Sequence, residues 1–102
     1  MKSLSEDAND SLKPLAARYV WWKKPEEALA VPEHALAHIM DLGTFEDMQM
    51  LIKIAGEDTL REVLQEALPG WFSPKSWHYW HYRLRMALPG QVPDLPKRTF
   101  SP

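Results

Sequence analysis

Two histidines and an aspartate in the middle of the sequence have the residue types and the spacing of a metal site. His34, His38 and Asp41 follow one another at intervals of four and three residues, which places their side chains on one face of a helix. Imidazole nitrogens and carboxylate oxygens are ligands of zinc and of non-haem iron. With His78 and His81 as a second half-site, such a cluster would support a metal-dependent enzyme.

A plainer interpretation, in which these histidines are solvated or cap helices, is the one we favour. A zinc-protease motif has glutamate directly after its first histidine, whereas Ala35 follows His34 here. The histidines also lie opposite the apolar face of their segment, where polar side chains are expected. The sequence contains no glycine-rich phosphate loop and no nucleophile elbow. We therefore expect a protein that is not an enzyme and that holds no metal and no cofactor.

A second group of candidate side chains is aromatic and basic. Residues 73–85 contain two Trp, two Tyr, two His and three basic residues. Helical spacing assigns one stripe of this segment to the core, namely Trp77, Trp80, His81, Leu84 and Leu88. Another stripe contains His78, Tyr82 and Arg85. Because Tyr and Arg anchor interfaces and Tyr stacks on bases, this stripe is either a binding surface or an exposed face with snorkelling basic chains.

The tryptophan pair and the carboxyl-terminal tail raise the same alternative. Trp21 and Trp22 are adjacent, so their indoles point in different directions and one core face is not expected to bury both. The proline-rich tail either docks on the body or on a second copy, or it binds a partner groove through Leu95 and Phe100. The candidate interaction residues are Trp21, Trp22, His78, Tyr82, Arg83, Arg85, Leu95, Lys97, Arg98 and Phe100.

Prolines and glycines delimit the helices that must position these side chains. Pro suits the first turn of a helix and Gly its end, and no segment shows the alternation of a strand. Thr44 with Asp47 resembles a capping box with Asp in place of Glu or Gln. The predicted helices are 14–22, 25–31, 32–43, 45–55, 57–68 and 74–88.

The predicted fold class is all-α. We expect a compact bundle of about five or six short helices with an extended Pro-rich C-terminal tail. Residues 1–12 are predicted as a flexible N-terminus, 13–90 as a single all-α domain and 91–102 as the tail. The helix over 45–55 is apolar nearly all round, so we place it centrally, with Trp77 and Trp80 buried against it.

The helix pair over 45–68 has the outline of a DNA-binding helix-turn-helix. Its second helix carries four carboxylates and one arginine, which would repel phosphates. We therefore interpret the pair as a structural hairpin.

Composition restricts the class of protein further. The chain has 102 residues, which suits one domain, and no cysteine, which fits a reducing cytoplasm. Its start is polar and acidic, and no apolar run approaches the roughly 20 residues that span a bilayer, so we expect a cytoplasmic protein without a membrane segment. Residues 25–68 carry ten acidic and two basic residues, and both flanking segments are basic overall. This distribution indicates self-complementarity or a basic partner surface, unless the acidic residues merely solvate helix faces.

Four segments resemble a small bacterial family. They are residues 19–29 (YVWWKKPEEAL), 42–47 (LGTFED), 73–81 (SPKSWHYWH) and 93–100 (PDLPKRTF). Members of that family are often encoded beside nucleotidyltransferase-type toxins of the AbiEii kind. The resemblance implies a candidate antitoxin and brings no catalytic residues with it.

These observations predict a non-catalytic protein–protein interaction module, with a nucleotidyltransferase-type toxin as candidate partner. The basic nucleotide site of such a toxin would complement the acidic middle of the chain. The alternative is a nucleic-acid-binding transcriptional regulator that uses the basic carboxyl-terminal region. Its contacts would be Lys75, His78, Tyr82, Arg83, Arg85, Lys97 and Arg98.

Overall fold

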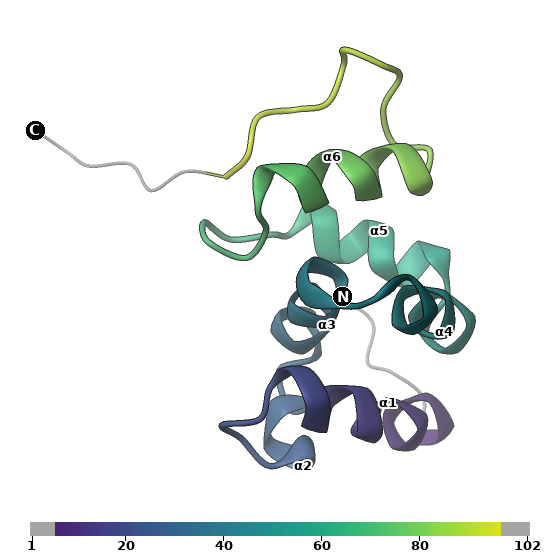
Figure 1. The fold of residues 1–102 in the computed structure, drawn as a ribbon, viewed down its shortest axis with the longest axis vertical. Coiled ribbons are helices and arrows are strands. Elements are labelled where there is room, and N and C mark those ends of the chain that lie inside the picture. Colours follow the sequence, from purple (N-terminus) through teal and green to yellow (C-terminus); the bar gives the residue numbers. More distant parts are fainter. Residues whose placement is uncertain (1–5, 97–102) are drawn as a thin grey trace, which may run out of the picture.

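The computed structural model describes residues 6–96, and these residues form helices without any strand (Figure 1). The elements are α1 (Glu6–Tyr19), α2 (Pro25–Ala28), α3 (Pro32–Leu42), α4 (Phe45–Ala55), α5 (Glu57–Gln65) and α6 (Pro74–Arg83). The prediction of a compact, all-α arrangement of short helices is confirmed for this part of the chain. Within it, no helix combines the length and the apolar character needed to cross a membrane.

The first helix differs from its prediction. Helix α1 begins at Glu6, so residues 6–12, which we predicted as part of a flexible terminus, form its first turns. Leu12, Leu15 and Ala16 are buried at helical spacing along it. Their burial outweighs the cost of Pro14 inside the helix, where proline removes a backbone hydrogen bond. The predicted start near Pro14 is therefore wrong, whereas the other five helices begin at the predicted residues.

Helix α3 lies at the centre of the fold and contacts each of the other helices. In Figure 1, α3 and α4 lie between α1 on one side and α5 with α6 on the other. Our prediction that α4 is the central helix is wrong, because Phe45 is 67% exposed and Met50 is 51% exposed. Helix α4 packs against α1, α3 and α5, but its apolar side chains extend beyond the face that these neighbours cover.

The predicted burial of Trp77 and Trp80 is confirmed, but the helix against which they pack is α3 and not α4, the helix that we predicted. The two indoles are 3% and 0% exposed. The Trp80 indole nitrogen donates a hydrogen bond of 2.8 Å to the backbone carbonyl of Met40 on α3. His81 and Leu84 of the same stripe are also buried. The core stripe was thus predicted correctly over the length of α6.

Helix α6 ends earlier than predicted, and this changes the environment of Leu88. The amides of Arg85 and Met86 donate to the carbonyls of Tyr82 and His81 at 3.1 and 2.8 Å, which is the Schellman pattern of a helix end. Arg85 has a positive φ of 58°. Leu88 was predicted in the core stripe, but it is 65% exposed, because the chain leaves the helix before reaching it.

The described part of the tail lies against the body. The Trp77 indole nitrogen donates a 2.7 Å hydrogen bond to the carbonyl of Pro93. Val92 and Leu95 are partly buried against the core, and residues 91–96 form neither helix nor strand. Lys97, Arg98 and Phe100, three of the predicted interaction residues, lie outside the described residues.

Candidate interaction site

Five rings from separate parts of the chain form a continuous row, which we call the aromatic row: Trp21, Trp22, His38, His34 and Trp71. Centroids of successive rings in this row lie 5.7, 5.1, 5.3 and 5.3 Å apart. The first three pairs meet edge to face, and the last pair is stacked with an interplanar angle of 9°. These are the favourable geometries of aromatic pairs.

Three elements position the row. Its two histidines are four residues apart on α3 and thus project from the same side of that helix. Trp21 and Trp22 belong to the turn after α1, which is held by buried Val20 and by a 3.2 Å hydrogen bond from the Lys23 amide to the Val20 carbonyl. Trp71 belongs to the connection between α5 and α6, beside buried Phe72.

The outer end of the row is exposed. Trp21 is 76% exposed and Trp22 is 50% exposed. This confirms that one core face does not bury both indoles. Each of the two indoles still has a ring neighbour, so the pair is held in place while a large apolar area faces water.

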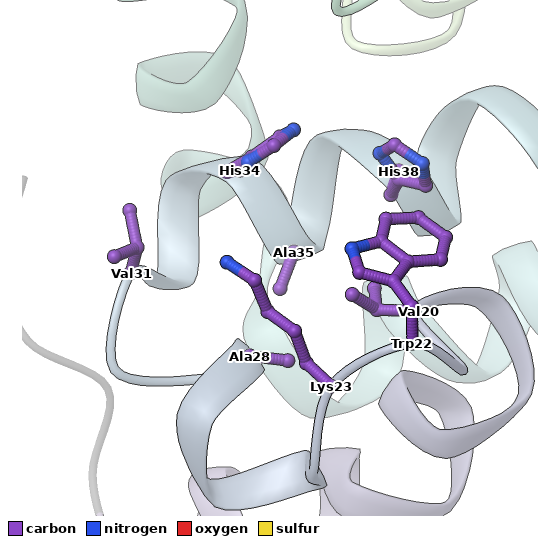
Figure 2. A pocket seen from close by; sticks show the side chains of 8 residues that line it. All are labelled: Val20, Trp22, Lys23, Ala28, Val31, His34, Ala35 and His38. Atoms are coloured by element: carbon purple, nitrogen blue, oxygen red, sulfur yellow. The ribbon is translucent and has the colours of Figure 1, made fainter.

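A small pocket of about 60 Å³ lies beside Trp22 (Figure 2). Its apolar lining comes from Val20, Ala28, Val31 and Ala35, and its polar lining from Trp22, Lys23, His34 and His38. Sites for small molecules and cofactors measure about 300–1,000 Å³. The pocket therefore suits a group of a few atoms, such as the end of one side chain.

The electrostatics of the pocket centre on His38. Burial, and then the neighbouring His34, hold the pKa of the His38 imidazole below its ordinary value, while Asp41 opposes this effect. His38 is therefore neutral at neutral pH. A neutral imidazole has one donor nitrogen and one acceptor nitrogen, so His38 is able to gain a proton when an anion approaches.

The structure does not assemble the metal ligands that the sequence suggested. The Asp41 carboxylate accepts hydrogen bonds from the Ser73 amide and hydroxyl at 2.9 and 3.0 Å, which holds the start of α6 next to the end of α3. The Nδ1 atoms of His78 and His81 lie 2.8 and 2.7 Å from backbone carbonyls of their own helix. Residues 6–96 contain no group of three or more side chains placed to hold a metal ion.

The second stripe of α6 is a separate surface. His78, Tyr82 and Arg85 are exposed, and the rings of His78 and Tyr82 lie 6.4 Å apart. Arg83, also predicted as an interaction residue, forms an ion pair of 3.3 Å with Glu57.

A buried carboxylate ties α1 to α4, and sequence reasoning did not find it. Asp47 accepts two hydrogen bonds from Nη1 of Arg18, at 2.8 and 3.1 Å, and one from the Tyr19 hydroxyl. Chiefly Tyr19, and then Arg18, hold the pKa of the Asp47 carboxyl below its ordinary value, although burial alone would raise it. Together with Arg83–Glu57, this pair links basic flanking segments to the acidic middle, which supports the self-complementary interpretation of the charges.

Sequence reasoning also missed two members of the candidate site. Trp71 gave no local signal because its stacking partner, His34, is distant in the sequence. Lys23 was noted as a neighbour of the tryptophans, but its place in the pocket depends on how the turn folds onto α3. Comparisons of the chain with protein-family models, curated proteins and solved structures give no match.

Proposed function

We propose that the protein is a non-catalytic protein–protein interaction module and that the aromatic row is its contact surface. The observation that carries this proposal is the exposure of two adjacent indoles, 76% for Trp21 and 50% for Trp22. A tryptophan side chain buries about 150–250 Å² when it is covered, and tryptophan is enriched among residues that dominate binding energy. Covering the two indoles with a partner would therefore contribute substantial hydrophobic free energy.

For the partner we propose a nucleotidyltransferase-type toxin, which would make the protein an antitoxin. The segment that resembles the family encoded beside such toxins, residues 19–29, contains both exposed indoles. Exposed Glu26 and Glu27 on the adjoining helix α2 would complement the basic nucleotide site of such an enzyme. In this proposal the protein acts in the cytoplasm by covering the partner's site.

As part of the same proposal, residues 91–102 are extended and form a second contact segment for the partner. Leu95 is already partly covered by the protein's own body. Phe100, with Lys97 and Arg98, is therefore the part of the tail that we assign to a partner.

A second candidate function is nucleic-acid binding through the surface at the end of α6. Tyr82, Arg85 and Leu88 line an open hollow there, and Tyr82 and Arg85 are exposed. An aromatic ring beside an arginine suits a stacked base and its phosphate. Such binding would weaken steeply as salt concentration rises.

The two functions are separated by measuring binding of matched variants to a purified nucleotidyltransferase-type toxin from the same organism. The Trp21→Ala/Trp22→Ala protein should bind at least about 30-fold more weakly, the equivalent of roughly 2 kcal/mol. The Tyr82→Ala/Arg85→Ala protein serves as the control and should bind like the wild type. Circular dichroism and thermal midpoints establish that both variants are folded.

The opposite pattern would overturn the proposal. If the wild type does not bind the toxin, the antitoxin role is wrong. If it binds and the tryptophan variant binds equally well, the aromatic row is not the contact surface. Loss of DNA or RNA binding in the Tyr82→Ala/Arg85→Ala protein, with a steep salt dependence in the wild type, would establish the nucleic-acid function instead.

A further inference from the structure

We propose that the pocket beside Trp22 receives the carboxylate of an aspartate or glutamate side chain from the protein partner. This inference rests on the proposed function, because it names the partner group that enters the contact surface. It predicts that one acidic residue of the partner lies among the groups that cover the two indoles.

Hydrogen-bond donors converge on the pocket. Figure 2 shows the ammonium nitrogen of Lys23 and the indole nitrogen of Trp22 on either side of Ala35, with His34 and His38 above them on α3. An ammonium and an indole N–H donate hydrogen bonds and do not accept them. Among residues 6–96, neither of these two groups has a hydrogen-bond or ion-pair partner within the protein. The donors are thus available to an acceptor from outside.

The pocket lacks negative charge of its own. No aspartate or glutamate is among its lining residues. Asp41, the acidic residue that acts on His38, directs its carboxylate to Ser73. An incoming carboxylate would therefore meet one full positive charge from Lys23 and neutral donors from the other rings.

The surroundings of the pocket favour a carboxylate from a protein over a phosphate from a nucleic acid. A volume of about 60 Å³ accommodates a small planar group, and the methylene stem of Asp or Glu would pack on Val31, which is 52% exposed. A nucleic acid would bring further phosphates beside exposed Glu26 and Glu27, and these like charges would repel one another.

Proton uptake should accompany binding. The charged and titratable groups around His38 are His34 and Asp41 on α3 and Lys23 from the turn after α1. A carboxylate in the pocket would stabilise the His38 imidazolium and raise the pKa of this side chain from its lowered value. By linkage, the carboxylate should bind more tightly as the pH falls toward the lowered pKa of free His38.

The proposal is tested by NMR titration with N-acetylglutamate amide and, as a neutral control, N-acetylglutamine amide. We expect the glutamate compound to shift the indole N–H signal of Trp22 and the ring signals of His34 and His38, and the glutamine compound to leave them in place. Lys23→Gln should weaken glutamate binding about three- to tenfold. Lys24→Gln is the matched control, because Lys24 is exposed and does not line the pocket, and it should bind like the wild type.

Three outcomes would overturn the proposal. These are equal shifts with both compounds, equal affinities of the Lys23→Gln and Lys24→Gln proteins, and inorganic phosphate binding more tightly than the glutamate compound. The last result would favour a nucleic-acid phosphate. Because these titrations need no partner protein, they can fail while the tryptophan variant still loses toxin binding. In that case the aromatic row would remain the contact surface and only the carboxylate assignment would be wrong.

Discussion

At the scale of single residues, the start of α4 depends on a side chain from another helix. The Thr44 hydroxyl accepts a 3.2 Å hydrogen bond from the Asp47 amide, which confirms the first half of the predicted capping box. In a complete capping box, the Asp47 side chain would accept a hydrogen bond from the Thr44 amide. Here that amide donates instead to the Tyr19 hydroxyl, at 3.3 Å. The local pattern predicted the cap. It could not predict the hydrogen bond to Tyr19, because that residue is 25 positions away in the sequence.

The Asp47 cluster should make the stability of the protein depend on acid. Its carboxyl pKa is lower in the folded chain than the ordinary value of 3.8, so near and below pH 4 the unfolded chain binds more protons. This contribution is complete well above the unfolded pKa of 3.8 and is lost as the pH falls through the folded pKa. Asp47→Asn should therefore be less stable than the wild type at pH 7, with a smaller difference at pH 3.

Thermal midpoints measured from pH 7 to pH 3 check this prediction. Asp58→Asn is the control, since Asp58 pairs with Arg61 on the surface and its side chain is 95% exposed. A gap between Asp47→Asn and the wild type that stays constant down to pH 3 would contradict the proposed role of the carboxylate.

At the scale of elements, prolines predicted the residues at which helices begin. The apolar patterns were a poorer guide to where each helix lies in the fold. Pro25, Pro32 and Pro74 each occupy the first turn of a helix, as expected. The apolar pattern of α4 did not reveal that one side of this helix is exposed to solvent, because periodicity records which side chains are apolar and not which faces have neighbours. The same holds for the aromatic row, whose members come from three separate segments.

The end of α6 offers a test of helix termination. Arg85 has a left-handed conformation with φ of 58°, which costs a residue with a β-carbon about 1–2 kcal/mol. Arg85→Gly should therefore raise the free energy of unfolding by about 0.5–1 kcal/mol, because glycine adopts this conformation without strain but loses more entropy on folding. Urea unfolding measures the change.

Arg85→Ala is the matched control for this test. It removes the same side chain but keeps the β-carbon, so it should not give the gain. Equal stabilities of the alanine and glycine variants would show that the left-handed conformation is not what limits stability at this position.

At the scale of the whole molecule, the tail contributes to the fold through Trp77. Truncation after Pro89 removes the 2.7 Å hydrogen bond to the Pro93 carbonyl and the partial burial of Val92 and Leu95. We expect the free energy of unfolding to fall by about 1–3 kcal/mol. Unchanged stability would indicate that the tail serves a partner alone.

A double-mutant cycle isolates the hydrogen bond in this loss. Trp77→Phe keeps a ring but loses the indole N–H, so it should cost about 1 kcal/mol more in the full chain than in the truncated chain. Equal costs in the two chains would mean that Trp77 does not hold the tail.

The aromatic row also couples the stability of the fold to the formation of a complex. It joins the turn after α1, the middle of α3 and the connection before α6, and these segments come together only when the chain is folded. A partner that covers the whole row thus recognises the native state and ignores the unfolded one. By mass action, a partner present at one hundred times its dissociation constant would add about 2.7 kcal/mol to the stability of the chain. Cells that contain more of the partner would then also contain more of the folded protein.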